Sequence, residues 1–339
     1  MDSTLPASSP DDERGTQLLY IAVIFTVISI VSLGLRCYTM GVILKRFFLA
    51  DWVAALTGLN QCALCAFTVL GVHYGLGKHV DDVSPENRIQ ALKWKWAAQV
   101  SYVVGSTLIK FIAGLLLLRL FTGQKWQRNS IIVLMVLLGL VQTAYLFIAI
   151  FQCTPIPFYW YRFTPDSPVK GKCNSRILAI VPSYISILLG VFSDWYLALL
   201  PITLVWGMQM QKKVKISVVG ILAVGSMASL ASVARIPYAK QLLSSPDYLV
   251  SFTDLAIWSI VECALGLMAT SLATLRPLFV RLNVLVSTHV LSTFQLRSRA
   301  AQRSAAARLG SSQAPLEHPT AHYDDVPPIS KLQSLKSEI

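Results

Sequence analysis

Four ionisable side chains lie inside long apolar segments of this sequence: Lys110, Asp194, Arg235 and Glu262. A charge inside a membrane is costly, so such residues pair with one another or line a pathway for a ligand, ion or proton. At the helical rise per residue, Lys110 lies about 15 Å and Asp194 about 18 Å from the same predicted face of the membrane. These matched depths predict an ion pair if the two helices face each other. Glu262 lies nearer the opposite face, and Arg235 is long enough to reach down from that face.

Two interpretations of these four charges remain open. In the first, they only fix how the helices pack. In the second, they form a binding site for a small molecule or a proton. A variant of the second interpretation is catalytic, because Asp194 or Glu262 has the chemistry of a general acid that protonates an apolar substrate.

The six cysteines fall into two groups. Cys153 and Cys173 bracket a polar loop, and a disulfide that closes about 20 residues would contribute roughly 3 kcal/mol if this loop faces an oxidising compartment. The other four lie in apolar segments, where a thiol usually packs as a small hydrophobic group. Two of them, Cys62 and Cys65, have Cys-x-x-Cys spacing, but neither a nearby His nor a second Cys pair accompanies them. The sequence therefore predicts one disulfide and no metal site.

The elements that must position these residues are membrane-spanning helices. Hydrophobic residues make up 54% of the 339 residues and charged residues only 14%, whereas soluble domains have roughly 45–50% and about 25%. This composition excludes a disordered chain, a coiled coil and a disulfide-dense secreted module. Lipid requires each span to satisfy its own backbone hydrogen bonds, so the spans are helices. The predicted fold is an all-α bundle of seven spans: residues 18–40, 51–73, 94–120, 130–152, 176–206, 216–238 and 254–276.

The distribution of basic residues predicts the orientation of the bundle. An odd number of spans places the termini on opposite sides, and Lys and Arg are more numerous in the connectors after the first, third and fifth spans and after the seventh. Basic connectors favour the cytoplasmic side, so we expect the N-terminus outside and the C-terminus inside. The formal net charge of +12 belongs to these flanks. No basic patch with interleaved aromatic residues accompanies it, so a nucleic-acid partner is not expected.

Four regions follow one another along the chain. We expect residues 1–17 to form an acidic extracellular leader; they are not the start of a cleaved signal peptide, because the apolar segment that follows is too long. Residues 18–277 form the seven-helix membrane domain. Residues 278–309 are expected to lie on an anionic leaflet as a basic amphipathic segment, with a basic disordered flank as the alternative. Residues 310–339 have the composition of a disordered cytoplasmic tail.

Eight short motifs succeed one another across the predicted spans. They are Arg36 followed by Ala50-Asp51-Trp52; Tyr74-Gly75-Leu76-Gly77-Lys78-His79; Lys110 with Leu118-Arg119-Leu120-Phe121; Phe151-Gln152-Cys153-Thr154-Pro155 with Phe158, Tyr159 and Trp160; Gly171-Lys172-Cys173; Ser193-Asp194-Trp195 with Leu199-Leu200-Pro201-Ile202; Trp258-Ser259-Ile260-Val261-Glu262; and Thr274-Leu275-Arg276-Pro277-Leu278. In this order they resemble the rhodopsin-domain integral membrane proteins of filamentous fungi. The resemblance covers about residues 20–280.

The resemblance implies a seven-helix domain with the disulfide in an outer loop, and it leaves the mechanism open. Rhodopsins attach retinal to a Lys of the seventh helix, and residues 254–276 contain none. The receptor-type Asp-Arg-Tyr motif is also absent from the end of the third span, where Leu118-Arg119-Leu120 stands, and the seventh span has no Asn-Pro-x-x-Tyr. Members of this family occur in fungal secondary-metabolite gene clusters, and the resemblance implies a similar association here.

These observations lead to one functional hypothesis and one alternative. The hypothesis is a non-retinal, non-catalytic seven-helix protein of the plasma membrane or an endomembrane. It is receptor-like or accessory to a metabolite pathway, and it binds a small molecule among its helices without a cofactor or metal. The alternative is an integral membrane enzyme, such as an acid-catalysed cyclase, that uses Asp194 or Glu262. Transport is less favoured, because no inverted repeat is visible. The lipid bilayer is the expected partner. The sequence of the tail does not indicate which cytoplasmic partner it would bind.

Overall fold

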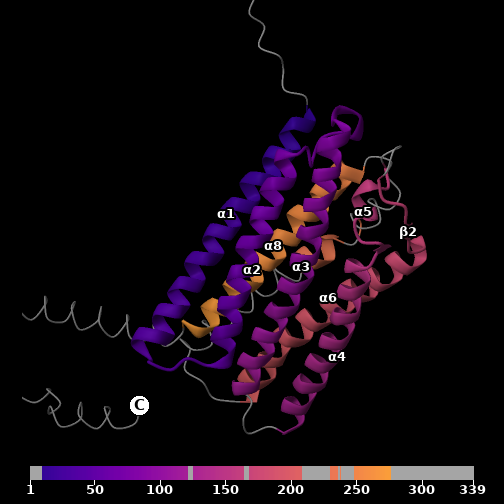
Figure 1. Cartoon of the computed structure of the whole chain (residues 1–339). Coiled ribbons are helices and arrows are strands. Elements are labelled where there is room, and N and C mark those ends of the chain that lie inside the picture. Colours follow the sequence, from indigo (N-terminus) through magenta and orange to yellow (C-terminus); the bar gives the residue numbers. More distant parts are fainter. Residues whose placement is uncertain are drawn as a thin grey trace, which may run out of the picture. The chain divides into compact units, whose positions relative to one another are not determined.

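The computed structural model of the chain describes residues 10–120, 125–163, 168–207, 230–235, 237 and 248–275. Its long helices in this part are α1 (Pro10–Tyr38), α2 (Leu49–His73), α3 (Pro85–Leu120), α4 (Lys125–Ile150), α6 (Arg176–Gly207) and α8 (Tyr248–Thr274), shown in Figure 1. Six stretches of these helices are long and apolar enough to cross a membrane. The prediction of a mostly helical, multi-pass membrane protein is therefore confirmed.

Short elements join the long helices. The π-helix η1 (Thr39–Ile43) continues α1, and the 3₁₀ helix η2 (Val80–Asp82) precedes α3. Between α4 and α6 lie β1 (Cys153–Thr154), α5 (Phe158–Tyr161) and β2 (Lys172–Cys173). The two strands pair in antiparallel register, with Cys153 opposite Cys173. The loop that the two cysteines bracket is therefore closed by backbone pairing as well as by any covalent bond.

Two helices begin earlier than hydropathy predicts. Helix α1 begins at Pro10 instead of residue 18, and α3 begins at Pro85 instead of residue 94. Hydropathy locates only the part of a helix that contacts lipid, whereas backbone hydrogen bonding continues into the polar residues beyond it. Proline is favoured in the first turn of a helix because its missing N–H would be unpaired there. The two prolines are thus start signals that hydropathy does not register.

Part of the predicted architecture lies outside the described residues. Of the predicted sixth span, 216–238, the structure describes the helical segment 230–235 and the isolated residue 237. The predicted amphipathic segment, 278–309, and the predicted tail, 310–339, lie wholly outside the described residues.

Helix α3 has the most partners among the described helices. It packs against α2, α4, α6 and α8, and it also contacts α5. Helix α8 packs against α1, α2 and α3. One apolar core joins α1, α2, α3 and α8 around Leu18, Leu64 and Ile260, and smaller ones join α3, α4 and α6 around Leu134 and Leu197. Residues of α3 are therefore placed to meet side chains from both groups of helices.

The turn after α2 needs glycine at two positions. Gly75 and Gly77 have φ angles of +105° and +103°, a region that side chains with a Cβ rarely adopt. A Cβ on Gly77 would also lie 2.8 Å from the Cα of Gly15 in α1. The turn can therefore rest directly on the first turns of α1, which places the start of α1 and the end of α2 on the same side of the bundle.

Candidate functional site

The structure brings together the four ionisable residues that the sequence singled out: Lys110 of α3, Asp194 of α6, Arg235 of the segment 230–235 and Glu262 of α8. Lys110 Nζ lies 3.0 Å from Asp194 Oδ1 and 3.9 Å from Glu262 Oε1. Arg235 Nη1 lies 3.0 Å from Glu262 Oε2. We call these four residues the charge network. Its charges alternate in sign, so each has an opposite charge beside it, and Glu262 connects the two cations.

Tyr102 is a member of this site that sequence reasoning missed. Its hydroxyl donates a hydrogen bond to Glu262 Oε2 over 3.0 Å and accepts one from Arg235 Nη1. The Arg235 guanidinium also lies over the Tyr102 ring, 4.1 Å from its centroid. Tyr102 precedes Lys110 by about two helical turns, so the two side chains share one face of α3. That spacing is the sequence signal that would have found it.

The charge network is buried in the bundle. Lys110, Arg235 and Glu262 are 6%, 8% and 7% exposed, and the Asp194 side chain is 18% exposed. Taking charges out of water is costly unless each is paired and hydrogen-bonded. The pairing across α3, α6, α8 and the segment 230–235 meets this requirement, and it ties these elements to one another.

A small polar cavity adjoins the charge network. Its volume is about 30 Å³, and its walls come from α3, α4, α6, the segment 230–235 and α8. Besides Lys110, Arg235 and Glu262, polar side chains such as Ser106 and Tyr145 line it. A volume of this size has room for one or two water molecules or for one polar group of a larger molecule. The site is therefore built to hold a polar group rather than an entire apolar molecule.

Two further polar side chains of the cavity bond to each other across helices. Ser186 of α6 donates a hydrogen bond to Gln142 Oε1 of α4 over 2.6 Å. Both side chains are buried and both line the cavity. Sequence reasoning missed them because it considered only ionisable residues in the spans, whereas buried amides and hydroxyls also need partners.

A second buried ion pair lies away from the cavity and was not predicted. Arg36 of α1 and Asp51 of α2 are 0% and 2% exposed. Arg36 donates through Nε to Asp51 Oδ1 over 2.9 Å and through Nη1 to the carbonyl of Thr270 in α8 over 3.0 Å. The other carboxylate oxygen of Asp51 accepts a hydrogen bond from the N–H of Phe48 at the start of α2. The pair thus joins α1, α2 and α8. The signal in the sequence was one charged residue near the end of the first span and one of opposite sign at the start of the second span.

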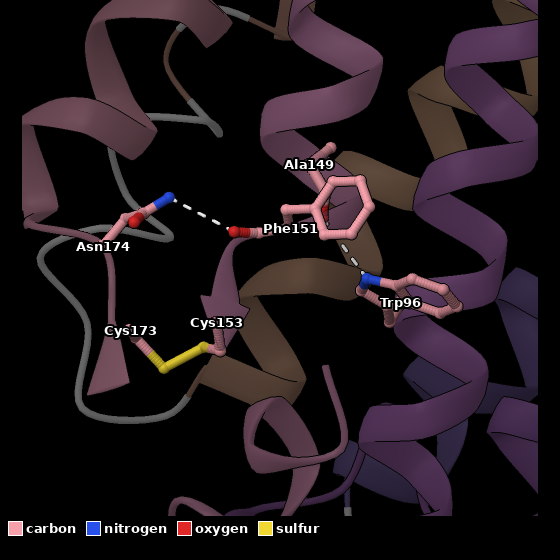
Figure 2. The surroundings of a disulfide bond; sticks show 6 residues. All are labelled: Trp96, Ala149, Phe151, Cys153, Cys173 and Asn174. Carbon is pink, nitrogen blue, oxygen red and sulfur yellow. Dashed lines mark hydrogen bonds between the residues drawn. A yellow bond between two sulfur atoms is a disulfide. The ribbon is translucent and has the colours of Figure 1, made fainter. Parts of the chain in front are cut away.

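The predicted disulfide is present between Cys153 and Cys173, as Figure 2 shows. Next to it, Asn174 Nδ2 donates to the carbonyl of Phe151 over 3.3 Å, and Trp96 of α3 donates through Nε1 to the carbonyl of Ala149 over 3.3 Å. These bonds hold the end of the loop to the residue that follows α4, and hold α4 to α3.

Helix α5 of the same loop packs against the N-terminal half of α3. The ring of Trp160 in α5 packs edge-on against that of Trp96, with centroids 6.0 Å apart. Tyr159 is buried, and burial raises the pKa of its hydroxyl, although the nearby Arg162 guanidinium opposes this rise. The disulfide-bonded loop thus packs against the N-terminal half of the helix that carries Tyr102 and Lys110.

The remaining cysteines do not gather into a metal site. Cys62 is exposed, and Cys65 is partly buried. Among the described residues, no three His, Cys, Asp or Glu side chains lie close enough together to hold a metal ion.

Two relatives link the chain to fungal membrane proteins. A protein of Metarhizium anisopliae, described as polyenoic acids biosynthesis gene cluster protein Ba17b, is 25% identical over 285 residues, which cover 80% of this chain and 75% of that protein. A SAT4 family membrane protein of Emericella nidulans is 28% identical over 182 residues, 53% of this chain and 46% of that protein. No solved structure matches the chain.

The match to a protein family extends over most of the chain. Residues 35–281 match the fungal rhodopsin domain, and this range contains the charge network, Tyr102 and the disulfide. The resemblance that the eight motifs indicated is confirmed by this match and by the SAT4 family relative. The chain belongs to the fungal rhodopsin domain family.

Proposed function

We propose that this protein binds a small molecule at the charge network, as a receptor-like or accessory component of a secondary-metabolite pathway. The observation that carries the proposal is the convergence of two cations, two carboxylates and Tyr102 on one polar cavity inside a membrane bundle. Helix packing alone requires paired charges, but it does not require a cavity beside them. Polar groups that converge on a cavity are the usual form of a ligand site.

One of the two relatives supports the pathway part of this proposal. The Metarhizium protein is named for a biosynthesis gene cluster of polyenoic acids, which are apolar molecules with a polar end. A membrane protein with an internal polar cavity suits molecules of that kind, because their apolar part partitions into the bilayer. The ligand is not retinal bound as a Schiff base to α8, since α8 contains no Lys.

We also propose the complete architecture: a seventh span at 216–238, the N-terminus outside and the C-terminus inside. The disulfide supports this orientation, because disulfides persist in oxidising compartments. The loop 153–173 follows the fourth of the long helices, so it lies on the same side as the start of α1. Residues 1–17 are then an extracellular leader, 18–277 the membrane domain, 278–309 a basic amphipathic segment on the inner leaflet and 310–339 a cytoplasmic tail.

Protease protection tests the orientation. An epitope tag at residue 5 should be cleaved in intact cells or sealed outside-out vesicles, and a tag at residue 320 should be cleaved only after the membrane is permeabilised. The opposite pattern would overturn the orientation and the assignment of the disulfide loop to the outside.

The acid-catalysis alternative has less support. Asp194 and Glu262 each lie 3.0 Å from a cationic nitrogen. Both carboxylates are engaged in ion pairs, and the adjoining cavity has room for one or two water molecules but not for an entire apolar substrate. The same carboxylates are well placed to orient a cation beside a ligand, which agrees with a binding site.

Gene deletion and complementation test the binding role. In the native fungus, the deletion strain should lose or change the output of one metabolite pathway, and the wild-type gene should restore it. A gene with both Lys110→Met and Asp194→Asn should fail to restore it, although its protein is present in the membrane in normal amount. The matched control is Arg36→Met with Asp51→Asn, which removes a buried ion pair away from the cavity and should restore the output.

The outcomes separate the hypotheses. Accumulation of an unreacted precursor in the deletion strain would favour the enzyme, whereas a loss of pathway expression would favour a receptor. Full restoration by the cavity double variant would mean that the charges serve packing only, and the binding proposal would be wrong.

A further inference from the structure

One end of the bundle carries a group of exposed basic side chains. It is the end where α1 stops and α2 begins, and where α3 stops and α4 begins. The exposed bases there are Lys45 and Arg46 in the turn before α2, Arg119 in the last turn of α3, and Lys125 and Arg128 in the first turn of α4. None of them forms an ion pair with a residue that the structure describes.

Acidic residues are distributed unevenly between the two ends. The sequence has no Asp or Glu in the connectors after the first, third and fifth predicted spans, 41–50, 121–129 and 207–215. Asp51, at the start of α2, is 2% exposed and paired with Arg36. The opposite end exposes acidic residues in η2 and in the first turn of α3. The exposed charge around the start of α2 is therefore positive, and an anionic surface complements it.

Exposed aromatic rings lie next to these bases. Phe47 follows Arg46 directly and is 44% exposed, and Trp52, in the first turn of α2, is 67% exposed. The centroids of the two rings are 5.6 Å apart. Trp is enriched at the level of the lipid headgroups, and long basic side chains extend from that level towards water. One surface can therefore contact both the acyl chains and the headgroup of a lipid.

A third base joins this surface from α3. The Arg119 guanidinium lies 3.8 Å from the centroid of the Phe48 ring. Phe48 is three residues from Lys45, so the contact brings Arg119 to the turn that carries Lys45 and Arg46. We name this group the basic turn surface: Lys45, Arg46, Phe47, Trp52 and Arg119.

The chemistry of the basic turn surface fits one kind of partner. We propose that it binds an anionic phospholipid, with Lys45, Arg46 and Arg119 on the headgroup phosphate and the two exposed rings against the acyl chains. A soluble anion would contact the bases but leave the rings without a partner, whereas a lipid contacts both. In the orientation proposed above, this lipid lies in the cytoplasmic leaflet, which contains the anionic phospholipids. The site is separate from the cavity and does not depend on the small-molecule proposal.

Fluorescence quenching of Trp52 tests the site in the full-length protein, reconstituted in phosphatidylcholine nanodiscs. The quencher is a small fraction of phospholipid with a nitroxide on its acyl chain near the headgroup, as phosphatidylserine or as phosphatidylcholine. The signal of Trp52 is the difference between the wild-type protein and Trp52→Phe, so lipid bound elsewhere does not contribute. The association constant for phosphatidylserine should exceed that for phosphatidylcholine at least about fivefold.

Matched variants test which side chains produce this preference. Lys45→Gln with Arg46→Gln should bring the two association constants to within about twofold of each other, and Arg119→Gln should lower their ratio at least about twofold. The control is Lys170→Gln with Lys172→Gln, which removes two exposed lysines of the disulfide-bonded loop. That loop follows the far end of α4, so the control should leave the ratio unchanged.

Inorganic phosphate distinguishes a lipid from a free anion. At about 10 mM and constant ionic strength it should leave the ratio in the wild-type protein unchanged, because it has no acyl chains for the rings to contact. Loss of the preference in phosphate would mean that the surface binds a soluble anion and that the lipid assignment is wrong. This comparison needs only the wild-type protein and Trp52→Phe, so it decides even if the double variant does not fold.

Three further results would overturn the proposal. Equal quenching by the two lipids in the wild-type protein would show that the surface does not select an anionic lipid. An unchanged ratio in Lys45→Gln with Arg46→Gln would show that other groups attract the lipid. An equal fall of the ratio in the loop control would show a general effect of net charge instead of a site.

Discussion

The chain contains two sets of buried charges that differ in what surrounds them. The Arg36–Asp51 pair is enclosed by backbone groups: a carbonyl of α8 accepts from the guanidinium, and an N–H at the start of α2 donates to the carboxylate. The charge network instead contacts side chains of four helical elements and borders a cavity. The two arrangements therefore differ in whether the buried charges are held by backbone groups or by side chains that line a cavity.

This difference separates a packing role from a binding role. A buried ion pair by itself is weak evidence of either function or stability, because the cost of removing charges from water offsets their attraction. What distinguishes the charge network is the adjoining cavity. The Arg36–Asp51 pair is thus the internal reference against which the network can be tested.

The largest loss of stability is expected from Asp51→Asn. It leaves the Arg36 guanidinium fully buried beside a neutral group, which costs about 3–5 kcal/mol when a partner is removed from a buried pair. Arg36→Met combined with Asp51→Asn should recover much of this loss. The measurement is the midpoint of unfolding in an SDS titration of the purified protein. A loss of unfolding free energy below about 1 kcal/mol would show that water reaches this pair. The Arg36–Asp51 pair could then no longer serve as the buried reference for the charge network.

A loss of about 3 kcal/mol is expected from opening the disulfide, for a closed loop of this length. Cys153→Ala and Cys173→Ala should destabilise equally, because either leaves the same open loop. Thiol labelling of the unfolded wild-type protein should modify these two cysteines only after reduction. Labelling of both without reductant would contradict the bridge. Unequal losses would mean that one side chain contributes beyond the bridge.

A smaller loss is expected within the charge network. Asp194→Asn should cost about 1.5–3 kcal/mol, the range for a hydrogen bond to a charged group, because Lys110 keeps Glu262 at 3.9 Å. Lys110→Met together with Asp194→Asn should cost less than the sum of the two single variants, since the partners are coupled. The same SDS titration measures the three variants. Strictly additive losses would mean that the two residues do not interact, and a loss as large as that of Asp51→Asn would erase the difference between the two regions.

The smallest effect is expected at the neutral hydrogen bond of the cavity. Ser186→Ala removes the donor to Gln142 and should cost about 0.5–1.5 kcal/mol. Ser130→Ala is the control, because Ser130 is partly exposed and, within the part of the chain that the structure describes, bonds only to the carbonyl of Trp126 in its own helix. It should lie within about 0.5 kcal/mol of the wild type. Equal effects of the two variants would show that the cavity side of the network contributes nothing beyond ordinary helix contacts.

Much of the site was predictable because a membrane makes charges conspicuous. Lys110, Asp194, Arg235 and Glu262 stand out in apolar segments, and matched depth along their helices was enough to suggest the Lys110–Asp194 contact. Tyr102, Gln142 and Ser186 did not stand out, since neutral polar residues are common in such helices. The Arg36–Asp51 pair was missed because each residue, taken alone, suits the polar boundary of a span.

The sequence by itself determined the class of the protein, the approximate positions of six apolar helices, the disulfide and the family, because hydropathy, loop cysteines and ordered motifs are local properties of the chain. Only the tertiary structure decided which helices are neighbours, that one carboxylate, Glu262, connects two cations, and that a cavity lies beside the charge network. These features depend on how side chains far apart in the sequence fill the space between helices, and no local sequence pattern predicts that packing.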